Sequence, residues 1–473
     1  MTDETRTIAG FVAGLQPEDI PPEVTARAAE FVLDAGGIAV RAHVDGDSTP
    51  ALRAGLAAAG VAPGPCGLFG SAETLAPAAA AGINAALVHT LDFDDTHIGG
   101  SVHVSAPVIP AALAAAQAAG ADGPRTIAAI VSGMEVMTRL GRALVPPRHY
   151  ARGYHPTATT GVFGAAAAAS TAMGLTAAQT EHALGIALSS AAGTLQFHAN
   201  GAWTKRLQVG LAAEAGVRAA CLAREGFTGA SEAIEGARGL LAVFSDAPEP
   251  AAATHAFGTE WEVMRIGVKP YPACRFAHAA IDQLLALGQG REGAVVRAED
   301  VAEIRIGLSR KALLAVAEPE ARKRHARNIV DAQFSVYFLA AAALLEGGVR
   351  WDDYPALLGR ADVDALADRV SAYHDEEVEA LYPAAMAARV MVRLRDGTER
   401  GGLVPAPLGE PETFPDRAML RDKATTLVAP VLGKPGAAAF CDAALGLSQG
   451  GAGRLFAAGV PASPARTPQA TGV

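Results

Sequence analysis

The sequence has few aromatic residues, few cysteines and no excess of positive charge. Aromatic residues make up 5% of its 473 positions and charged residues 19%, whereas apolar residues make up 50%. The four cysteines, Cys66, Cys221, Cys274 and Cys441, lie far apart and form no Cys-x-x-Cys pair. Neither a disulfide framework nor a zinc ribbon is therefore expected, and a reducing, cytoplasmic compartment fits best.

Several classes of partner and cofactor are disfavoured by what is missing. A formal net charge of -10 is opposite to that of a surface that replaces counterions on nucleic acid. No stretch approaches the roughly 18 apolar residues that span a bilayer, and the start, MTDETRTIAG, lacks the pattern of a signal peptide. No Walker loop, no G-x-S-x-G elbow and no dinucleotide-binding glycine motif occurs after a strand. We expect no nucleic-acid partner, no membrane association and no cofactor.

Most of the chain has the texture of helices. Alanine is abundant, and alanine favours helices whose axes approach closely. Between residues 21 and 244 apolar segments of period 3.6 alternate with breaks that contain Gly, Pro, Ser or Thr. The predicted helices are 21–43, 76–91, 107–119, 126–144, 159–173, 177–193 and 205–225, and the helical texture returns at 417–432 and 437–445.

The texture changes between residues 262 and 404. Alternating segments at 261–269 and 301–308, and a hairpin at 388–404 that turns at Asp396-Gly397, indicate strands. Helices are predicted between them at 275–287, 332–345 and 363–373. Because a core seldom grows beyond about 250–300 residues, two domains are expected. The predicted fold is mainly α: a large all-helical domain (1–261 and 405–460), a smaller inserted α+β domain (262–404) and a disordered tail (461–473).

The segment HTLDFDDTHIGGSVHVS is the most unusual local sequence. Its polar residues crowd the end of one apolar helix and the Gly-rich loop after it, and loops on rigid helices often carry chemistry. A metal site, an acid–base site and a polar cap between two helices all remain open. A metal site is disfavoured because His97 and His103, on either side of a glycine loop, lack the short ligand spacing of metal motifs. The residues concerned are Asp92, Asp94, Asp95, Thr96, His97 and His103.

Two further segments place polar residues where helices begin. His155 precedes Pro156 at the entrance to a helix, where free N–H groups attract carboxylates; it could equally be a packing or capping histidine. Lys205 and Arg206 stand at another predicted helix start, where the helix dipole disfavours cations. That placement indicates either an anionic ligand or a solvated pair.

A fourth segment, VKPYPACRFAHAAID, begins the second predicted domain. It holds Lys269, Cys274, Arg275 and His278 within ten residues, and two prolines stiffen it. Cys274 could be a nucleophile beside cations, or the small buried apolar group that free cysteines often are.

Together these segments resemble the MmgE/PrpD family, which includes 2-methylcitrate dehydratases, cis-aconitate decarboxylases and an iminodisuccinate epimerase. The resemblance runs in order along nearly the whole chain, and the ordered set is far more specific than any one segment. The matching stretches are DFDDTH at 92–97, the segment of His103, YHPTATTGVFGAAAAAS, KRLQVGLAAEAG, GFTGASEAIEGARGL, KPYPACRFAHAAID and DAQFSVYFLAAAALLEGG.

The resemblance implies a helical domain with an inserted lid domain, a homodimer, and an active site in the cleft between the domains. It also implies site residues. The catalytic candidates are His103, His155, Lys205, Lys269 and Asp92, and the substrate-binding candidates are Thr96, His97, Cys274, Arg275 and His278. Two departures stand out. Val104 precedes Ser105 where the family commonly has Pro-Ser, and Cys274 stands where the decarboxylases have histidine.

The resemblance implies a lyase that works without metal on a small di- or tricarboxylate. A proton beside a carboxylate would be removed by histidine, and the resulting negative charge stabilised by lysine. The first expectation is a hydro-lyase of the 2-methylcitrate dehydratase type. An isomerase or epimerase, a decarboxylase of the cis-aconitate type and a non-catalytic binding protein of the same fold remain as alternatives.

Overall fold

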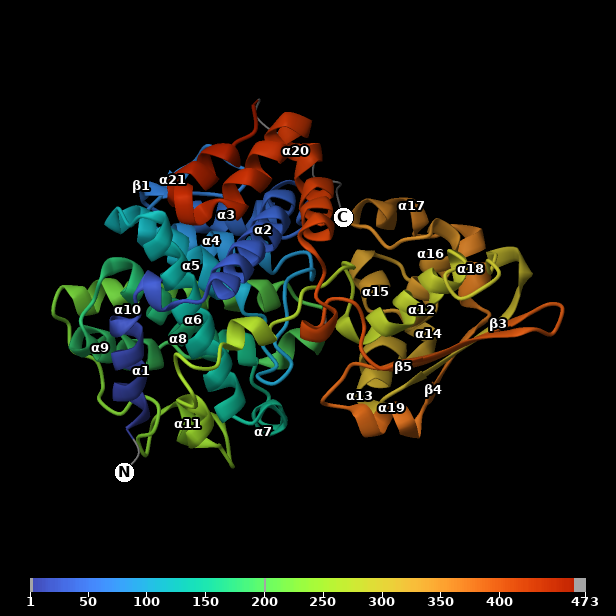
Figure 1. The fold of residues 1–473 in the computed structure, drawn as a ribbon, viewed down its shortest axis with the longest axis horizontal. Coiled ribbons are helices and arrows are strands. Elements are labelled where there is room, and N and C mark those ends of the chain that lie inside the picture. Colours follow the sequence, from blue (N-terminus) through green and yellow to red (C-terminus); the bar gives the residue numbers. More distant parts are fainter. Residues whose placement is uncertain (1–2, 200, 463–473) are drawn as a thin grey trace. The chain divides into compact units, whose positions relative to one another are not determined.

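The chain folds into two compact units. The computed structural model describes residues 3–199 and 201–462; unit 1 combines Met1–Gly267 with Asp416–Val473, and unit 2 is Val268–Pro415 (Figure 1). The sequence placed these two boundaries at 262 and 404. Residues 463–473 of the predicted tail lie outside the described residues. Each unit has its own interior and is described by itself.

Unit 1 is a helical assembly, as the alanine-rich periodic segments predict. A small antiparallel ribbon of β1 (Pro63–Gly67) and β2 (Thr74–Leu75), which the sequence did not reveal, is added to it. Its helices are α1 (Glu4–Gly14), α2 (Pro22–Asp45), α3 (Thr49–Ala58), α4 (Pro77–Val88), α5 (Ser105–Ala119), α6 (Gly123–Ala143), α7 (Pro146–Ala151), α8 (Pro156–Met173), α9 (Ala177–Leu188), α10 (Thr204–Arg224), α11 (Leu240–Phe244), α20 (Arg417–Leu445) and α21 (Leu447–Ala458).

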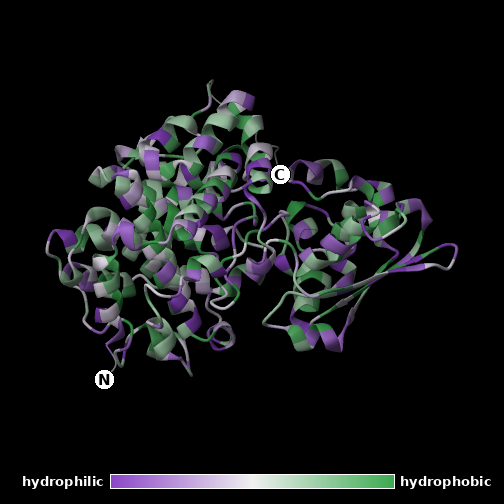
Figure 2. Cartoon of the chain, viewed as in Figure 1, coloured by the Kyte–Doolittle hydropathy of each residue, from purple (hydrophilic) through white to green (hydrophobic). Residues whose placement is uncertain are grey.

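Helix α8 lies at the centre of unit 1. Its residues from Pro156 to Ala172 are all buried, and it packs against α5, α6, α9 and α10. Small residues allow this crowding: an added Cβ at Gly216 of α10 would lie 2.5 Å from Ala165 Cβ of α8. Apolar residues are concentrated on the inner helices (Figure 2), so close backbone approaches and buried apolar side chains together fill the interior of unit 1.

The C-terminal helices complete unit 1. Helix α20 packs on α2, and α21 packs on α6. Lys423 of α20 pairs with Asp34 of α2 at 2.6 Å and donates a hydrogen bond to the carbonyl of Phe93 at 3.0 Å. The return of the chain therefore supports the loop that contains the DFDDTH segment. Helix α20 bends at Gly433, in the gap left between its two predicted parts.

Unit 2 is built around one four-stranded sheet with the order β4-β3-β5-β6. The predicted strand at 301–308 and the hairpin at Asp396-Gly397 are confirmed. Strands β3 and β4 are parallel and the other pairs are antiparallel. Helix α12 packs against β5 and β6, and α16 against β4. The strands are β3 (Val301–Leu308), β4 (Val370–His374), β5 (Ala388–Leu394) and β6 (Glu399–Val404), and the helices are α12 (His278–Gly288), α13 (Arg310–Ala312), α14 (Glu320–Lys323), α15 (Ile329–Gln333), α16 (Val336–Glu346), α17 (Tyr354–Leu357), α18 (Ala361–Ala367) and α19 (Glu376–Leu381).

Three sequence predictions near or in unit 2 were wrong. The predicted strand 261–269 contains a 3-10 turn at Glu262–Arg265, because Glu262 is turned inward to bond His97 and Arg142. The predicted helix 363–373 ends at Ala367, and its second half becomes β4, paired with β3. The predicted helix 332–345 is interrupted at Ser335, whose side chain caps the start of α16.

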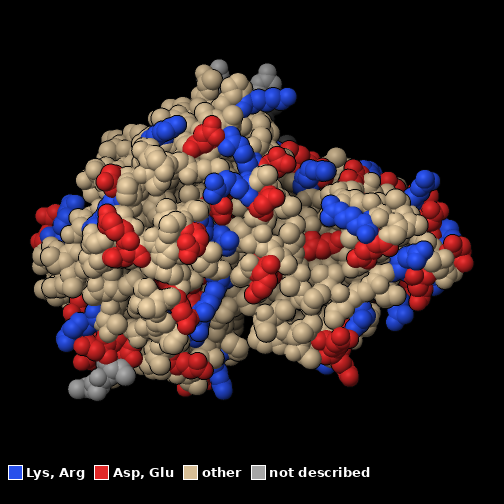
Figure 3. All heavy atoms as spheres, viewed as in Figure 1, with Lys and Arg blue, Asp and Glu red and all other residues tan. Residues whose placement is uncertain are grey.

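The surface carries charged side chains of both signs (Figure 3). Basic and acidic side chains are interspersed on the face that Figure 3 shows, with no broad field of one sign. Within residues 3–199 and 201–462, no helix is both long and apolar enough to cross a membrane.

We predict that Gly216→Val destabilises the protein by about 1–3 kcal/mol, because the new side chain overpacks the contact between α8 and α10. Urea unfolding measures the loss. Gly55→Ala on α3 is the matched control, since an added Cβ there meets nothing within 4 Å. It is expected to stabilise the helix by about 0.5–1 kcal/mol. Equal stability of the two variants would contradict this account of the packing.

Candidate active site

A buried aspartate in the loop between α4 and α5 bonds the start of α5 and so holds the loop in place. Asp95 is fully buried, and its carboxylate accepts the N–H groups of Ser105 at 3.0 Å and Val104 at 3.3 Å. This is the polar-cap role, because carboxylates satisfy the free donors at helix starts. Burial, together with the charge of Asp94, raises the pKa of Asp95 well above its usual value.

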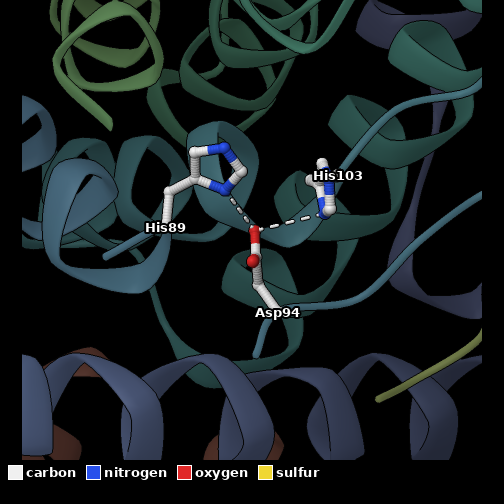
Figure 4. A group of neighbouring side chains, drawn as sticks. All are labelled: His89, Asp94 and His103. Atoms are coloured by element: carbon white, nitrogen blue, oxygen red, sulfur yellow. Dashed lines mark hydrogen bonds and ion pairs between the residues drawn. The ribbon is translucent and has the colours of Figure 1, made fainter. Parts of the chain in front are cut away.

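Two histidines flank the neighbouring carboxylate. His89 Nδ1 lies 2.7 Å from Asp94 Oδ2, and His103 Nδ1 lies 3.6 Å from the same oxygen. Figure 4 shows both rings turned toward this one carboxylate. His89 and Asp94 are buried, whereas the side chain of His103 is 20% exposed. Of the two imidazoles, His103 is therefore the one that solvent or a ligand can reach.

The hydrogen bonds of His103 define its tautomer. Nδ1 lies 2.8 Å from the carbonyl oxygen of Asp95, and a carbonyl can only accept, so Nδ1 carries the proton. The backbone N–H of His103 also donates to Thr157 Oγ1 at 3.1 Å, which ties the loop to the start of α8. His103 thus keeps Nε2 as an acceptor for a proton.

His155 lies beside His89. The ring centroids of His89 and His103 are 4.8 Å apart, and those of His89 and His155 are 6.1 Å apart. His155 Nδ1 lies 3.1 Å from Gln208 Oε1, and the amide nitrogen of Gln208 donates to the carbonyl of Thr194. Burial first, and then the nearby His89, lower the pKa of His155 well below its usual value, so the ring is neutral at pH 7.

An ammonium group lies in the same region. Lys205 Nζ donates to Asp92 Oδ1 at 2.7 Å, with the two side chains 23% and 11% exposed. Asp92 has a positive φ of 52°, a conformation that is uncommon outside glycine. The charge of Lys205 contributes to lowering the pKa of both His89 and His155. Unit 1 therefore brings together Asp92, His103, His155 and Lys205, four of the five predicted catalytic residues.

Two other predicted residues of the loop are placed differently. His97 Nε2 lies 2.9 Å from Glu262 Oε2, and its Nδ1 accepts the N–H of Gly100 at 2.9 Å. Both ring nitrogens thus hold the loop, and we assign His97 to support rather than to substrate binding. Thr96 pairs through its backbone with Gly267, and its buried hydroxyl has no hydrogen-bond partner among the described residues.

Four predicted residues lie in unit 2, where two of them form a structural network. Arg275 is buried and donates to Glu410 Oε1 at 2.6 Å and 2.8 Å. His278 accepts from Arg275 through Nδ1 at 3.0 Å, and its Nε2 donates to the carbonyl of Ala273. Lys269 and Cys274 are also buried, at 2% and 9% exposure. Arg275 and His278 therefore brace the segment that carries Lys269.

A metal ion is the other chemistry that this region could support. The candidate ligand atoms of His89, Asp94 and His103 lie within 4.8 Å of one another. However, both Nδ1 atoms are hydrogen-bond donors, to Asp94 and to the Asp95 carbonyl, and a protonated nitrogen has no lone pair for a metal. In these tautomers neither Nδ1 atom is available to a metal ion, and the three residues can serve as an acid–base group.

Comparison with known proteins finds one family along most of the chain. The MmgE/PrpD N-terminal domain matches residues 6–253, and the MmgE/PrpD C-terminal domain matches residues 271–448. The chain belongs to the MmgE/PrpD family. A cis-aconitate decarboxylase of Aspergillus terreus is 28% identical over 94% of this chain and 93% of its own. The cis-aconitate decarboxylase-like protein oryM of Aspergillus oryzae is 29% identical over 86% of both chains, and the human cis-aconitate decarboxylase is 29% identical over 58% and 56%.

This MmgE/PrpD protein has one site residue that sequence reasoning missed. His89 stands just before the noticed cluster of aspartates, inside what reads as an apolar helix. The sequence did carry a signal, because a histidine at the end of a helix can hydrogen-bond a carboxylate that follows it by five residues, across the turn. Only the folded loop shows that it does.

We predict that the free energy of unfolding falls as the pH drops below about 6.5, the ordinary histidine value. Burial is the main cause that lowers the pKa of His89, His149 and His155, and it lowers that of His43 to about 4. Below pH 6.5 the unfolded chain takes up protons that the folded chain resists, so the stability present above pH 6.5 is lost by up to about 1.4 kcal/mol per pH unit for each such histidine.

His149→Phe isolates one contribution, because the ring of His149 bonds the carbonyl of Phe244 through Nδ1, and its buried Nε2 has no hydrogen-bond partner within residues 3–199 and 201–462. Urea unfolding of both proteins at pH 7, 6 and 5 should show a shallower decline for the variant. Parallel declines would show that His149 takes up a proton equally well in both states.

Proposed function

We propose that this MmgE/PrpD protein is a cofactor-independent lyase that acts on a small di- or tricarboxylic acid through a carbanion-like intermediate. The observation that carries the proposal is the cluster in unit 1. It combines an accessible imidazole, a second neutral imidazole and an ammonium group around a polar loop. These are the groups needed to move a proton beside a carboxylate and to stabilise the resulting charge.

His103 is the proposed base. Its Nδ1 proton is directed at the Asp95 carbonyl, which leaves Nε2 to accept a proton from the carbon beside a substrate carboxylate. The imidazolium that forms is stabilised by Asp94, whose carboxylate oxygen lies 3.6 Å from Nδ1. This arrangement uses a neighbouring carboxylate to support a histidine that gains charge during the reaction.

Lys205 and His155 are proposed to act on the negative charge and on the leaving group of the substrate. Lys205, oriented by Asp92, places a cation near the imidazoles, where it can bind a carboxylate and stabilise negative charge that develops on it. His155 donates its Nδ1 proton to Gln208 and is neutral, so its Nε2 carries no proton and can accept a hydrogen bond from a substrate hydroxyl. Thr96 and Cys274 remain predicted substrate contacts, and Lys269 remains a predicted carboxylate-binding residue.

Elimination of water is the first proposed reaction: His103 removes the proton from carbon, and the ammonium of Lys205, the acid beside the base, gives a proton to the departing hydroxide. Loss of carbon dioxide is the second candidate, and it is favoured by the relatives that are named cis-aconitate decarboxylases. Both reactions pass through the same carbanion-like state. The homodimer and the cytoplasmic location stay predictions.

We predict that the purified protein converts at least one acid from a panel of citrate, 2-methylcitrate, cis-aconitate and related dicarboxylates. Proton NMR in heavy water identifies the reaction: an alkene formed from a hydroxy acid indicates dehydration, whereas deuterium incorporated as carbon dioxide is lost indicates decarboxylation. His103→Ala should lower turnover at least about 100-fold, the contribution typical of a positioned acid–base group.

His149→Phe serves as the matched control, because it also removes a buried histidine of unit 1 but lies outside the cluster. Its turnover at pH 7.5 should stay near that of the natural protein. Full activity of His103→Ala would remove His103 from the mechanism, and no conversion of any acid in the panel would contradict the proposed substrate class.

We further predict that exhaustive chelation with EDTA leaves turnover unchanged, since the imidazole Nδ1 atoms beside Asp94 already donate hydrogen bonds. Metal content is measured before and after treatment to show that any ion has been removed. A loss of activity that one divalent ion restores would overturn this prediction.

A further inference from the structure

His89 is a buried polar residue to which the proposed reaction assigns no task. Its side chain is 0% exposed, as is that of Asp94. Nδ1 lies 2.7 Å from Asp94 Oδ2, so it donates to the carboxylate, and the opposite nitrogen, Nε2, is buried with no hydrogen-bond partner among the described residues. A buried acceptor without a partner costs free energy, and such groups call for an explanation.

The geometry around Asp94 shows what the other nitrogen of His89, Nδ1, does. The same oxygen, Oδ2, lies 2.7 Å from His89 Nδ1 and 3.6 Å from His103 Nδ1. The first distance is a strong charge-assisted hydrogen bond, whereas the second is too long for a hydrogen bond and leaves only electrostatic attraction. His103 meanwhile directs its Nδ1 proton to the Asp95 carbonyl at 2.8 Å. Both rings face the Asp94 carboxylate (Figure 4), and of the two it is His89 that is hydrogen-bonded to it.

We propose that His89 is a positioning residue that holds Asp94 back from His103, so that the carboxylate attracts a charged His103 without binding it. The inference rests on the proposed role of His103 as a base. A base must be unprotonated before the reaction and must gain a proton during it. A carboxylate bonded directly to Nδ1 would favour the protonated ring too early, and no carboxylate at all would leave the imidazolium unsupported.

Other charged groups face the same rings. Lys205 and Asp92 act on His89 from the start of α10 and from the loop, and His155 lies beside it at the entrance to α8. Asp95 contacts His103 through its carbonyl and caps α5 with its carboxylate. Lys205 and Asp92 largely balance each other as a close pair. Asp94 is therefore the charge whose position His89 can change.

The test compares two substitutions that should shift the titration of His103 in opposite directions. A merely structural role of His89 would not produce opposite shifts. His89→Phe keeps a ring in the buried space but removes the donor, so Asp94 turns toward His103 and the His103 ring titrates about one pH unit higher. Asp94→Asn removes the charge, so the His103 ring titrates about one pH unit lower. Histidine-labelled protein followed by NMR between pH 5 and 9 measures both shifts, and His103→Gln identifies the resonance.

Two further variants sharpen the comparison. His89→Asn places an amide N–H near the position of Nδ1 and removes Nε2, and it should restore the titration of the natural protein. His149→Phe removes another buried histidine whose Nδ1 bonds a carbonyl instead of a carboxylate, and it should leave His103 unchanged. If His89→Phe does not fold, His89→Leu takes its place.

Shifts of the same sign in His89→Phe and Asp94→Asn, or no shift in His89→Phe, would overturn the proposal. The NMR titration needs no substrate, so it stands even if none of the tested acids is converted. If one is converted, the acidic limb of kcat/KM against pH should move upward in His89→Phe and downward in Asp94→Asn. An unmoved limb with shifted NMR titrations would instead contradict His103 as the base and leave the role of His89 intact.

Discussion

A single buried carboxylate organises the candidate site. Asp94 is removed from solvent, and a buried charge is tolerated only when donors and opposite charges surround it. Here the end of α4 supplies His89, and the loop before α5 supplies His103. The next residue, Asp95, caps α5 and so sets the path of the loop. Removing this carboxylate would take away the hydrogen-bond acceptor of His89 and the negative charge that faces His103.

The site also depends on how tightly the helices of unit 1 approach. His103 is tied to the start of α8 through Thr157, and α8 is buried along its length by neighbours rich in alanine and glycine. From the other end of the chain, Lys423 holds the carbonyl of Phe93, two residues before Asp95. Close backbone packing thus fixes the loop at a precision that long flexible side chains would not provide.

Neutral imidazoles are the chemical consequence of that burial. Desolvation is the largest cause that lowers the pKa of His89 and His155, while His103, with its side chain 20% exposed, remains accessible. The environment thereby separates histidines that support the site from the one that can exchange a proton. The chain belongs to the MmgE/PrpD family, and a histidine that can exchange a proton is what the proposed lyase reaction requires.

The family resemblance implied the grouping of Asp92, His103, His155 and Lys205. The sequence by itself determined the family, the helical character, the strand at 301–308 and the hairpin at Asp396-Gly397. These follow from periodicity, turn residues and ordered motifs, which are local properties of the chain. Only the tertiary structure decided that 370–374 is a strand, that His97 serves Glu262, and that His89 shares Asp94 with His103. Each of these depends on a partner brought near by folding, and no spacing along the chain specifies such a partner.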